Sequence, residues 1–430
     1  PKSSIPLNMR ETCISFLIRY ICANDHRAID SELGVRAINI LSTLLSEDYW
    51  PDVNVKLSYF EKFLTNIDSG SDNTLYYCIN TLDVLYIFFT NKSDKWIMEN
   101  LNTIQGLLDK AIKTNHHDIQ ETLVKVLNVI LKVIKSENAV STPGDDSPST
   151  TFIKFLVSVI NQDLQGASSI AAGVTLVWTL FGNFPEHLDS LLTPIMKSFN
   201  KLCKDHLSIS QPKDAVTMEE AKLTTKLLER LLCLLSMKIS SLGDARRPFL
   251  STIALLIDRS MDQHFLKKII CLSRTWVFNN EVFPTIKEKA AILTKMLAFE
   301  VRGEPSLSTL VYEIVLELFD NKQFNNTEIT VRMEQPFLVG TKTQNIDIRR
   351  RFMKILEGSL EKDLKERLYY VIRDQNWEFI ADYPWLNQAL QLIYGSFDES
   401  HILTLTNTFD MSSPNYLHEF LPEDDANETD

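Results

Sequence analysis

The sequence has little glycine, no paired cysteine motif and no excess of positive charge. Glycine supplies 12 of 430 residues, and so low a content argues against a turn-rich β architecture. The six cysteines stand singly in apolar runs, which predicts reduced core thiols in a cytosolic or nuclear protein and not a disulfide framework. The net charge is −12, from 44 Lys and Arg against 56 Asp and Glu. This charge argues against direct nucleic-acid binding, because few phosphate counterions would be released.

One stretch, residues 164–185, has no charged residue over a length that could cross a membrane. Polar side chains interrupt it, no Lys/Arg asymmetry flanks it, and it ends in the helix-stop sequence Gly182 to Pro185. We therefore expect a helix buried between two neighbours, and no membrane partner.

Elsewhere the apolar residues recur with helical spacing. Phe152, Leu156 and Val159 mark one face of a helix, and a run of leucines between 223 and 235 marks another. The sequences Thr217 to Glu220 and Thr285 to Glu288 both have the pattern of a capping box, which predicts helix starts at these two places.

Helix-breaking residues interrupt the chain every 20 to 30 residues, so that two helices and their turns make a unit of roughly 40 to 47 residues. This is the period of HEAT-type repeats, which need only an apolar stripe on each helix to stack. The predicted fold class is all-α, an α-solenoid of HEAT-like helical repeats. The predicted divisions are repeats over 1–135, a disordered polar loop over 136–151, repeats over 152–320, an irregular insertion over 321–347, helical repeats over 348–408 and an acidic linker over 409–430.

Different sequence patterns predict the loop and the insertion. Residues 136–151 are rich in Ser, Pro and Asp and show no apolar period, so they bury too little to offset ordering entropy. Residues 329–333 alternate apolar and polar side chains before Gln335 to Gly340, which favours an extended segment.

Catalytic signatures fail on inspection. The run from Gly340 to Thr343 lacks the glycines of a phosphate-binding loop, and the motifs of kinases and of the serine-hydrolase nucleophile elbow are missing. Cys203 and His206, with Cys233 downstream, offer zinc-type ligands, but no second close pair completes a tetrahedral site. We expect no enzyme activity, no metal and no cofactor.

The candidate sites are therefore surfaces. Arg349, Arg350 and Arg351 form the densest basic cluster, and Trp377 and Trp385 follow it along the chain. The arginines could hold an acidic partner segment or could form salt bridges to neighbouring repeats, and the second interpretation is favoured. Tryptophan and arginine together are typical of interface centres, although such tryptophans are more often core residues.

The C-terminal third resembles a known family. The segments that carry the resemblance are QPFLVG (335–340), RRRFMKILEGSL (349–360), LKERLYYVIRDQNWEFI (364–380) and WLNQALQLI (385–393). They resemble the TRRAP family, very large pseudokinase scaffolds related to the phosphatidylinositol-3-kinase-like kinases. IPLNMRETCISFLIRY (5–20) is similar to the same family, and the diverged polar loops between are typical of a fungal member.

The resemblance implies a HEAT-repeat segment upstream of the FAT domain, within a nuclear, non-enzymatic scaffold. It also implies partners, namely the other subunits of SAGA and NuA4 type histone acetyltransferase complexes and acidic transcription activation domains. Two alternatives remain open at this point. The chain could be the regulatory solenoid of an active kinase of the same superfamily, or a transport receptor of the importin type.

Overall fold

A computed structural model describes residues 5–359, except 47, 51, 52, 54, 65–71, 141–146, 209–213, 280, 325, 326 and 342. All regular elements in this described part are helices, and they fall into two compact units, Pro1–Lys238 and Ile239–Asp430. The all-α prediction is therefore confirmed. Among the described helices, none combines the length and the apolar character that a membrane crossing requires.

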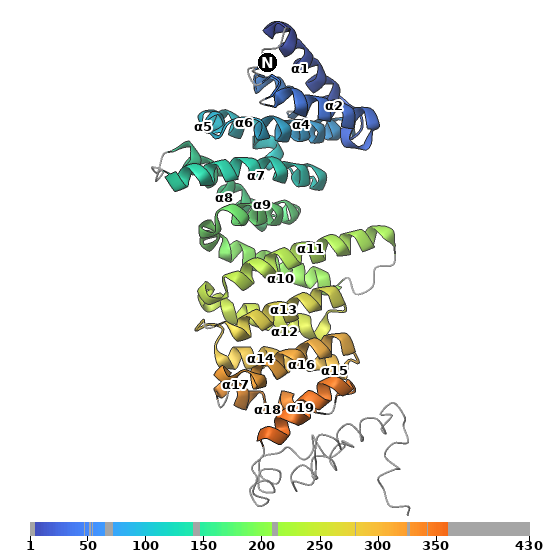
Figure 1. The fold of residues 1–430 in the computed structure, drawn as a ribbon, viewed down its shortest axis with the longest axis vertical. Helices are drawn as coiled ribbons and strands as arrows, with labels where there is room; N and C mark the ends of the chain where they lie inside the picture. Colours follow the sequence, from blue (N-terminus) through green and yellow to red (C-terminus); the bar gives the residue numbers. More distant parts are fainter. Residues whose placement is uncertain are drawn as a thin grey trace, which may run out of the picture. The chain divides into compact units, whose positions relative to one another are not determined.

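The first unit is a stack of helix pairs (Figure 1). In it α4, α7, α9 and α11 form one layer, and α3, α6, α8 and α10 form the other, each helix touching the next in its own layer. The helices of this unit are α1 (Leu7–Cys22), α2 (Glu32–Leu45), α3 (Ser58–Leu64), α4 (Asp72–Thr90), α5 (Asp94–Glu99), α6 (Leu101–Ile112), α7 (His117–Val140), α8 (Pro148–Gln165), α9 (Ile170–Asn183), α10 (Leu188–Ser208) and α11 (Ala215–Met237).

The second unit repeats this two-layer arrangement. Helices α12, α14 and α17 form one layer, and α13, α16 and α19 form the other. The helices of this unit are α12 (Arg246–Arg259), α13 (Gln263–Phe278), α14 (Ile286–Met296), α15 (Ala298–Val301), α16 (Pro305–Asp320), α17 (Glu328–Arg332), α18 (Glu334–Gly340) and α19 (Ile346–Ser359).

Polar contacts between successive repeats have a regular separation along the chain. The pairs Lys125 with Asp83 and Arg246 with Glu288 are each 42 residues apart, and Arg302 bonds the Ser260 carbonyl at the same separation. This interval lies within the repeat length predicted from the helix breakers. Each of these three contacts joins one helix pair to the next.

The uncharged stretch forms a buried helix, as predicted. α9 covers Ile170–Asn183 and packs against α7, α8 and α11, and ten of its 14 residues are buried, including Thr175 and Thr179. Thr179 donates its hydroxyl proton to the Thr175 carbonyl, so the polar side chain is satisfied within the helix.

Two predicted irregular regions are largely helical. Within the predicted loop 136–151, α7 continues to Val140 and α8 begins at Pro148, because Ser147 caps the helix through the Thr150 amide and proline suits the first helical turn. Residues 141–147 lie between the two helices, and of these 141–146 lie outside the described residues. The prediction was therefore wrong at both ends of the loop.

The prediction of an extended insertion over 321–347 was wrong, because the described part of this segment contains helices. α17 and α18 occupy it, and α17 stacks on α14 as the next helix of that layer. Ile329 and Met333 are buried while Val331 is 67% exposed. This is helical spacing of four and not strand alternation. Residues 360–430, including the rest of the predicted repeats and the acidic linker, lie outside the described residues.

The two capping predictions had different outcomes. Thr285 and Glu288 form the predicted box at the start of α14. At α11 the box lies three residues earlier than predicted, with Asp214 as the cap and Thr217 as its partner. An Asp carboxylate accepts a hydrogen bond from a free backbone amide as well as a hydroxyl does. The sequence pattern alone therefore does not determine which residue caps the helix.

The six cysteines are free thiols, and their burial varies. Cys22, Cys78 and Cys203 are buried, as predicted for core thiols, whereas Cys13 and Cys271 are exposed. Burial raises the pKa of Cys78 to about 12. The buried thiols are therefore unreactive at neutral pH.

Asp163 is a buried carboxyl in the last turn of α8. Its side-chain atom Oδ2 has no hydrogen-bond partner among the residues that the structure describes. Burial raises the pKa of Asp163 to about 6. The folded state therefore favours the protonated acid, while the unfolded chain ionises at its ordinary pKa of about 3.9.

Replacing Asp163 with Asn is expected to stabilise the first unit above about pH 6 and to change little near pH 4. Because the folded-state pKa is raised, wild-type stability falls as pH rises from about 4 to about 6 and stays lower above that range. We expect a gain of about 1 to 3 kcal/mol near pH 7.5 in urea unfolding. Asp30→Asn, an exposed change in the same unit, is the control. An unchanged pH profile in Asp163→Asn would contradict the expectation.

Candidate protein-interaction surfaces

The three consecutive arginines of α19 point to different surroundings. Arg349 is only 4% exposed, and its guanidinium donates to the Thr343 carbonyl at 3.4 Å. Burial, with a smaller effect from neighbouring Arg350, lowers the pKa of Arg349. Its side chain is therefore part of the packing and not of an open patch.

The other two arginines are paired with carboxylates. Arg350 lies 3.5 Å from Asp347 within its own helix. Arg351 donates two hydrogen bonds to Glu313 of α16, at 2.7 and 2.8 Å. The contact of Arg351 is a salt bridge to a neighbouring repeat, as in the favoured interpretation, whereas that of Arg350 stays within α19. Binding of a partner by this cluster stays a prediction, and its companions Trp377 and Trp385 lie outside the described residues.

A groove of about 480 Å³ runs beside Arg351, between α13 and α16. Arg274 pairs with Glu317 across it at 2.8 and 2.9 Å, and the pair of Arg351 with Glu313 also lines it. Asp320 adds a third carboxylate to the lining. With two arginines and three carboxylates, this groove does not favour an acidic ligand.

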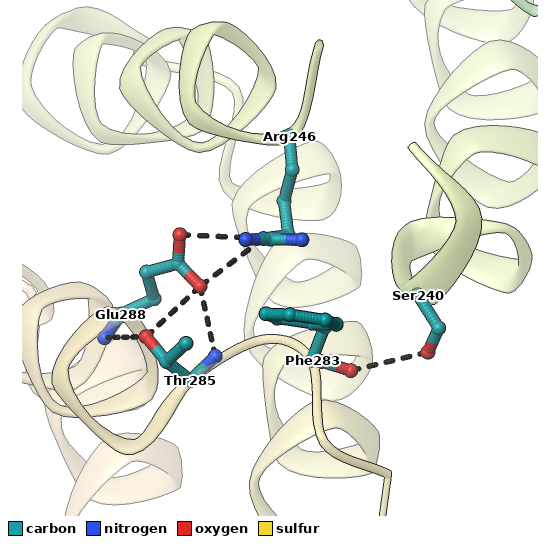
Figure 2. A network of polar contacts seen from close by, with 5 residues as sticks. All are labelled: Ser240, Arg246, Phe283, Thr285 and Glu288. Atoms are coloured by element: carbon teal, nitrogen blue, oxygen red, sulfur yellow. Dashed lines mark hydrogen bonds and ion pairs between the residues drawn. The ribbon is translucent and has the colours of Figure 1, made fainter. Parts of the chain in front are cut away.

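A polar network joins the loop before α14 to α12 (Figure 2). Glu288 accepts from the Thr285 amide at 2.8 Å, and Arg246 donates to both Glu288 oxygens at 3.2 and 3.3 Å. The guanidinium of Arg246 also lies 3.9 Å from the ring centroid of Phe283, whose carbonyl accepts from Ser240. Burial opposes ionisation of Glu288, but the bonds from Thr285 and Arg246 outweigh it and lower its pKa. The network fixes one repeat on the next.

A second groove, of about 680 Å³, has the opposite charge. It lies along α14 and α17 and is lined by Lys287, Lys295 and Arg332, with three alanines and Thr294 between them. Lys295 pairs with Asp258 and Arg332 with Glu328, in solvent-exposed pairs that are worth little. We call this surface, Lys287–Lys295–Arg332 with its alanine floor, the basic groove.

Sequence reasoning missed the basic groove. Its cations come from two helices and are up to 45 residues apart, so no cluster is visible along the chain. The signal that was available is a run of small residues and cations at helical spacing, namely Lys287, Ala291 and Thr294 on α14 and Ala298 at the start of α15.

The suggested zinc ligands do not converge on a site. Within the described part of the chain, no three His, Cys, Asp or Glu side chains come close enough to hold a metal ion. Cys203 is buried, and burial raises its pKa further from the range in which a thiolate forms.

Comparison with known proteins identifies the family. A family model described as the Tra1 HEAT repeat ring region matches residues 1–430. The chain belongs to the Tra1 HEAT repeat ring family. This confirms the resemblance to the TRRAP family found in the sequence.

Relatives of the Tra1 family match the chain over nearly its whole length. The Saccharomyces cerevisiae protein named SAGA complex/NuA4 acetyltransferase complex subunit TRA1 is 67% identical over 98% of the chain. The Schizosaccharomyces pombe Tra1 subunit of the same name is 27% identical over 92% of the chain, and the human transformation/transcription domain-associated protein is 24% identical over 91%. The chain spans about 11% of the length of each of these relatives.

Proposed function

We propose that this chain is a non-catalytic scaffold segment of a nuclear transcription coactivator, in which it supports assembly of SAGA or NuA4 type histone acetyltransferase complexes. The observation that carries the proposal is the 67% identity, over 98% of the chain, to a protein named as a subunit of both complexes. Stacked helix pairs present long surfaces on which other subunits can bind.

The test is a capture of the tagged longer protein from nuclear extract, followed by a nucleosome acetylation assay. Intact protein should bring down acetyltransferase activity, and deletion of these 430 residues should remove it. Because a deletion can unfold neighbouring parts of the protein, a second variant keeps all 430 residues. It carries only Arg274→Gln and Arg351→Gln, on the surface of the second unit. Absence of activity in the intact capture contradicts the proposal.

We also propose that the recruiting contact with acidic activation domains uses the basic groove. Residues 239–359 carry 17 Lys and Arg against 14 Asp and Glu, a net charge of +3 in a chain of −12. The small residues on the groove floor allow close approach of a helix, and Val331 beside Arg332 is 67% exposed. An acidic amphipathic helix fits this combination of apolar floor and cationic rim.

The test uses a synthetic peptide with Asp and Glu on one helical face and Leu and Phe on the other. Lys287→Gln, Lys295→Gln and Arg332→Gln together should weaken its binding about tenfold, because local charge attraction and rim contacts are lost. The matched control neutralises the exposed residues Arg259, Lys267 and Lys268 of the same unit and should change binding less than about twofold. A third variant, Arg350→Gln with Arg351→Gln, tests the arginine cluster. A larger loss there than in the groove variant would return the site to α19.

A further inference from the structure

Net charge is distributed unevenly along the chain. Residues 1–238 carry 23 Lys and Arg against 27 Asp and Glu, residues 239–359 carry 17 against 14, and residues 360–430 carry 4 against 15. The three net charges are therefore −4, +3 and −11. Almost the whole negative excess follows directly after a positive region, and opposite net charges favour association of the two.

The most acidic stretch is the predicted linker 409–430, which lies outside the described residues. Its sequence has seven Asp and Glu and no Lys or Arg. Three of the carboxylates form the run Glu423–Asp425, and four large apolar residues precede this run, namely Tyr416, Leu417, Phe420 and Leu421. Their spacing matches one face of a helix. The stretch therefore combines the acidic and apolar residues that the basic groove is proposed to bind.

The basic groove supplies the complementary groups. Lys287 and Lys295 are exposed on α14, and Arg332 of α17 also lines the groove. Each helix adds an exposed apolar side chain directly before one of these cations, since Ile286 is 38% and Val331 67% exposed. Three cations beside an apolar floor can therefore receive three carboxylates and the apolar residues next to them.

We propose that residues 414–430 dock in the basic groove of the same chain, with the run Glu423–Asp425 on the cations and the apolar residues on the alanine floor. An acidic activation domain then binds the groove only when it displaces this segment. The regulation rests on the function proposed above for the basic groove.

The same chain is favoured over a second copy as the source of the segment. α19 ends at Ser359, and the stretch from there to Pro414 is about 50 residues long, enough to span far more than the width of a two-layer helical unit. A segment tethered in this way has a higher effective concentration at the groove than a second copy in dilute solution.

Cross-linking tests the docking contact itself. A water-soluble carbodiimide joins a carboxylate to a lysine amine only when the two groups lie in contact. The purified longer protein is treated with this reagent, and the cross-linked peptides are identified by mass spectrometry. We expect Lys287 and Lys295 to be joined to the run Glu423–Asp425, and exposed Lys267 and Lys268 of α13 not to be. Absence of the groove cross-links would overturn the proposal. In a mixture of isotopically light and heavy protein, cross-links that join only light to heavy chains would assign the segment to a second copy and would also overturn it.

Neutralising the acidic run should free the groove. In the longer protein, Glu423→Gln, Asp424→Asn and Asp425→Asn together should tighten binding of the synthetic acidic amphipathic peptide about tenfold, because an occupied groove lowers the apparent affinity by the fraction of molecules in which it is free. The matched control removes the same charge from three exposed positions of the second unit, namely Asp244→Asn, Asp320→Asn and Asp347→Asn. This control should change peptide binding less than about twofold.

The two measurements separate this proposal from the proposed function. Missing cross-links and an unchanged peptide affinity in the Glu423–Asp425 variant would overturn docking of the segment. The proposed function would still be supported if the variant of Lys287, Lys295 and Arg332 loses peptide binding. If the peptide binds without the help of these three cations, the proposed function and the regulation both fail, and groove cross-links alone would support docking of the segment.

Discussion

Replacing Phe352 with alanine should lower the free energy of unfolding of the second unit by about 4 kcal/mol. Phe352 is completely buried where α16, α18 and α19 meet. Its ring makes edge contacts with Tyr312 at 5.8 Å and with Phe337 at 5.1 Å between centroids. Truncation removes the apolar contact area and leaves a cavity that rigid helices close only in part, so both costs add.

Hydrogen exchange is the suitable measurement, because two units need not unfold as one transition. Amides of α16, α18 and α19 should exchange faster in Phe352→Ala, while those of the first unit should be unchanged. Phe16→Ala is the matched control, since this phenylalanine is 67% exposed and its truncation should have little effect on the isolated chain. A loss below about 1 kcal/mol for Phe352→Ala would contradict the described core.

Replacing Gly173 with alanine should destabilise the first unit by about 3 kcal/mol. Gly173 lies on α9 where this helix crosses the end of α8. A Cβ atom there would lie 2.9 Å from the Leu164 amide nitrogen and 3.0 Å from the Asp163 Cβ. Because the nearest atom belongs to the backbone, no rotamer change relieves the contact, and the two helices would have to separate.

The same helix offers a control for helix propensity. Gly182 also lies on α9, and a Cβ atom there would meet nothing within 4 Å. Gly182→Ala should therefore be neutral or stabilise by up to about 1 kcal/mol, as expected when alanine replaces an exposed helical glycine. Urea unfolding of both variants separates the cost of the close contact between helices from the effect of helix propensity. Similar effects of the two substitutions would contradict the close approach of α8 and α9.

The apolar helical stripes were predictable because each buried position on a helix needs an apolar residue. Phe152, Leu156 and Val159 are buried on α8, and Leu227, Leu231 and Leu235 are buried on α11, as their spacing indicates. The pattern also gave the repeat length, since each helix pair must end before the next begins. The assignment of helices to layers needed the three-dimensional contacts, because all stripes look alike in the sequence.

The irregular region was mistaken for a different reason. A full-length helix of its layer is here replaced by two short ones, α17 and α18, which meet at Met333. Five residues of α17 are too few to show a helical period, so burial of Ile329 and Met333 could be confused with strand alternation. Packing against α14 supplies the stability that a five-residue helix lacks on its own.

The arginine cluster shows why a surface patch cannot be predicted from residues that are merely adjacent in the sequence. Successive residues of a helix point about 100° apart, so Arg349 is buried, Arg350 is half-buried and Arg351 is exposed. The basic groove has the converse property, since it joins cations that the sequence separates. A functional patch on a helical stack is therefore recognised from the residues that share a layer and a helix face, and not from runs of like charge in the sequence.

The regular separation of the contacts between repeats has a mechanical consequence. Arg246 with Glu288 and Arg274 with Glu317 each connect one helix pair to its neighbour, so a pulling force along the second unit acts on every junction in the series and the weakest junction yields first. Detachment of a single helix pair would release about 40 residues, or about 140 Å of extended chain, without breaking the next junction. The unit would lengthen in discrete steps under load and recoil by the same steps.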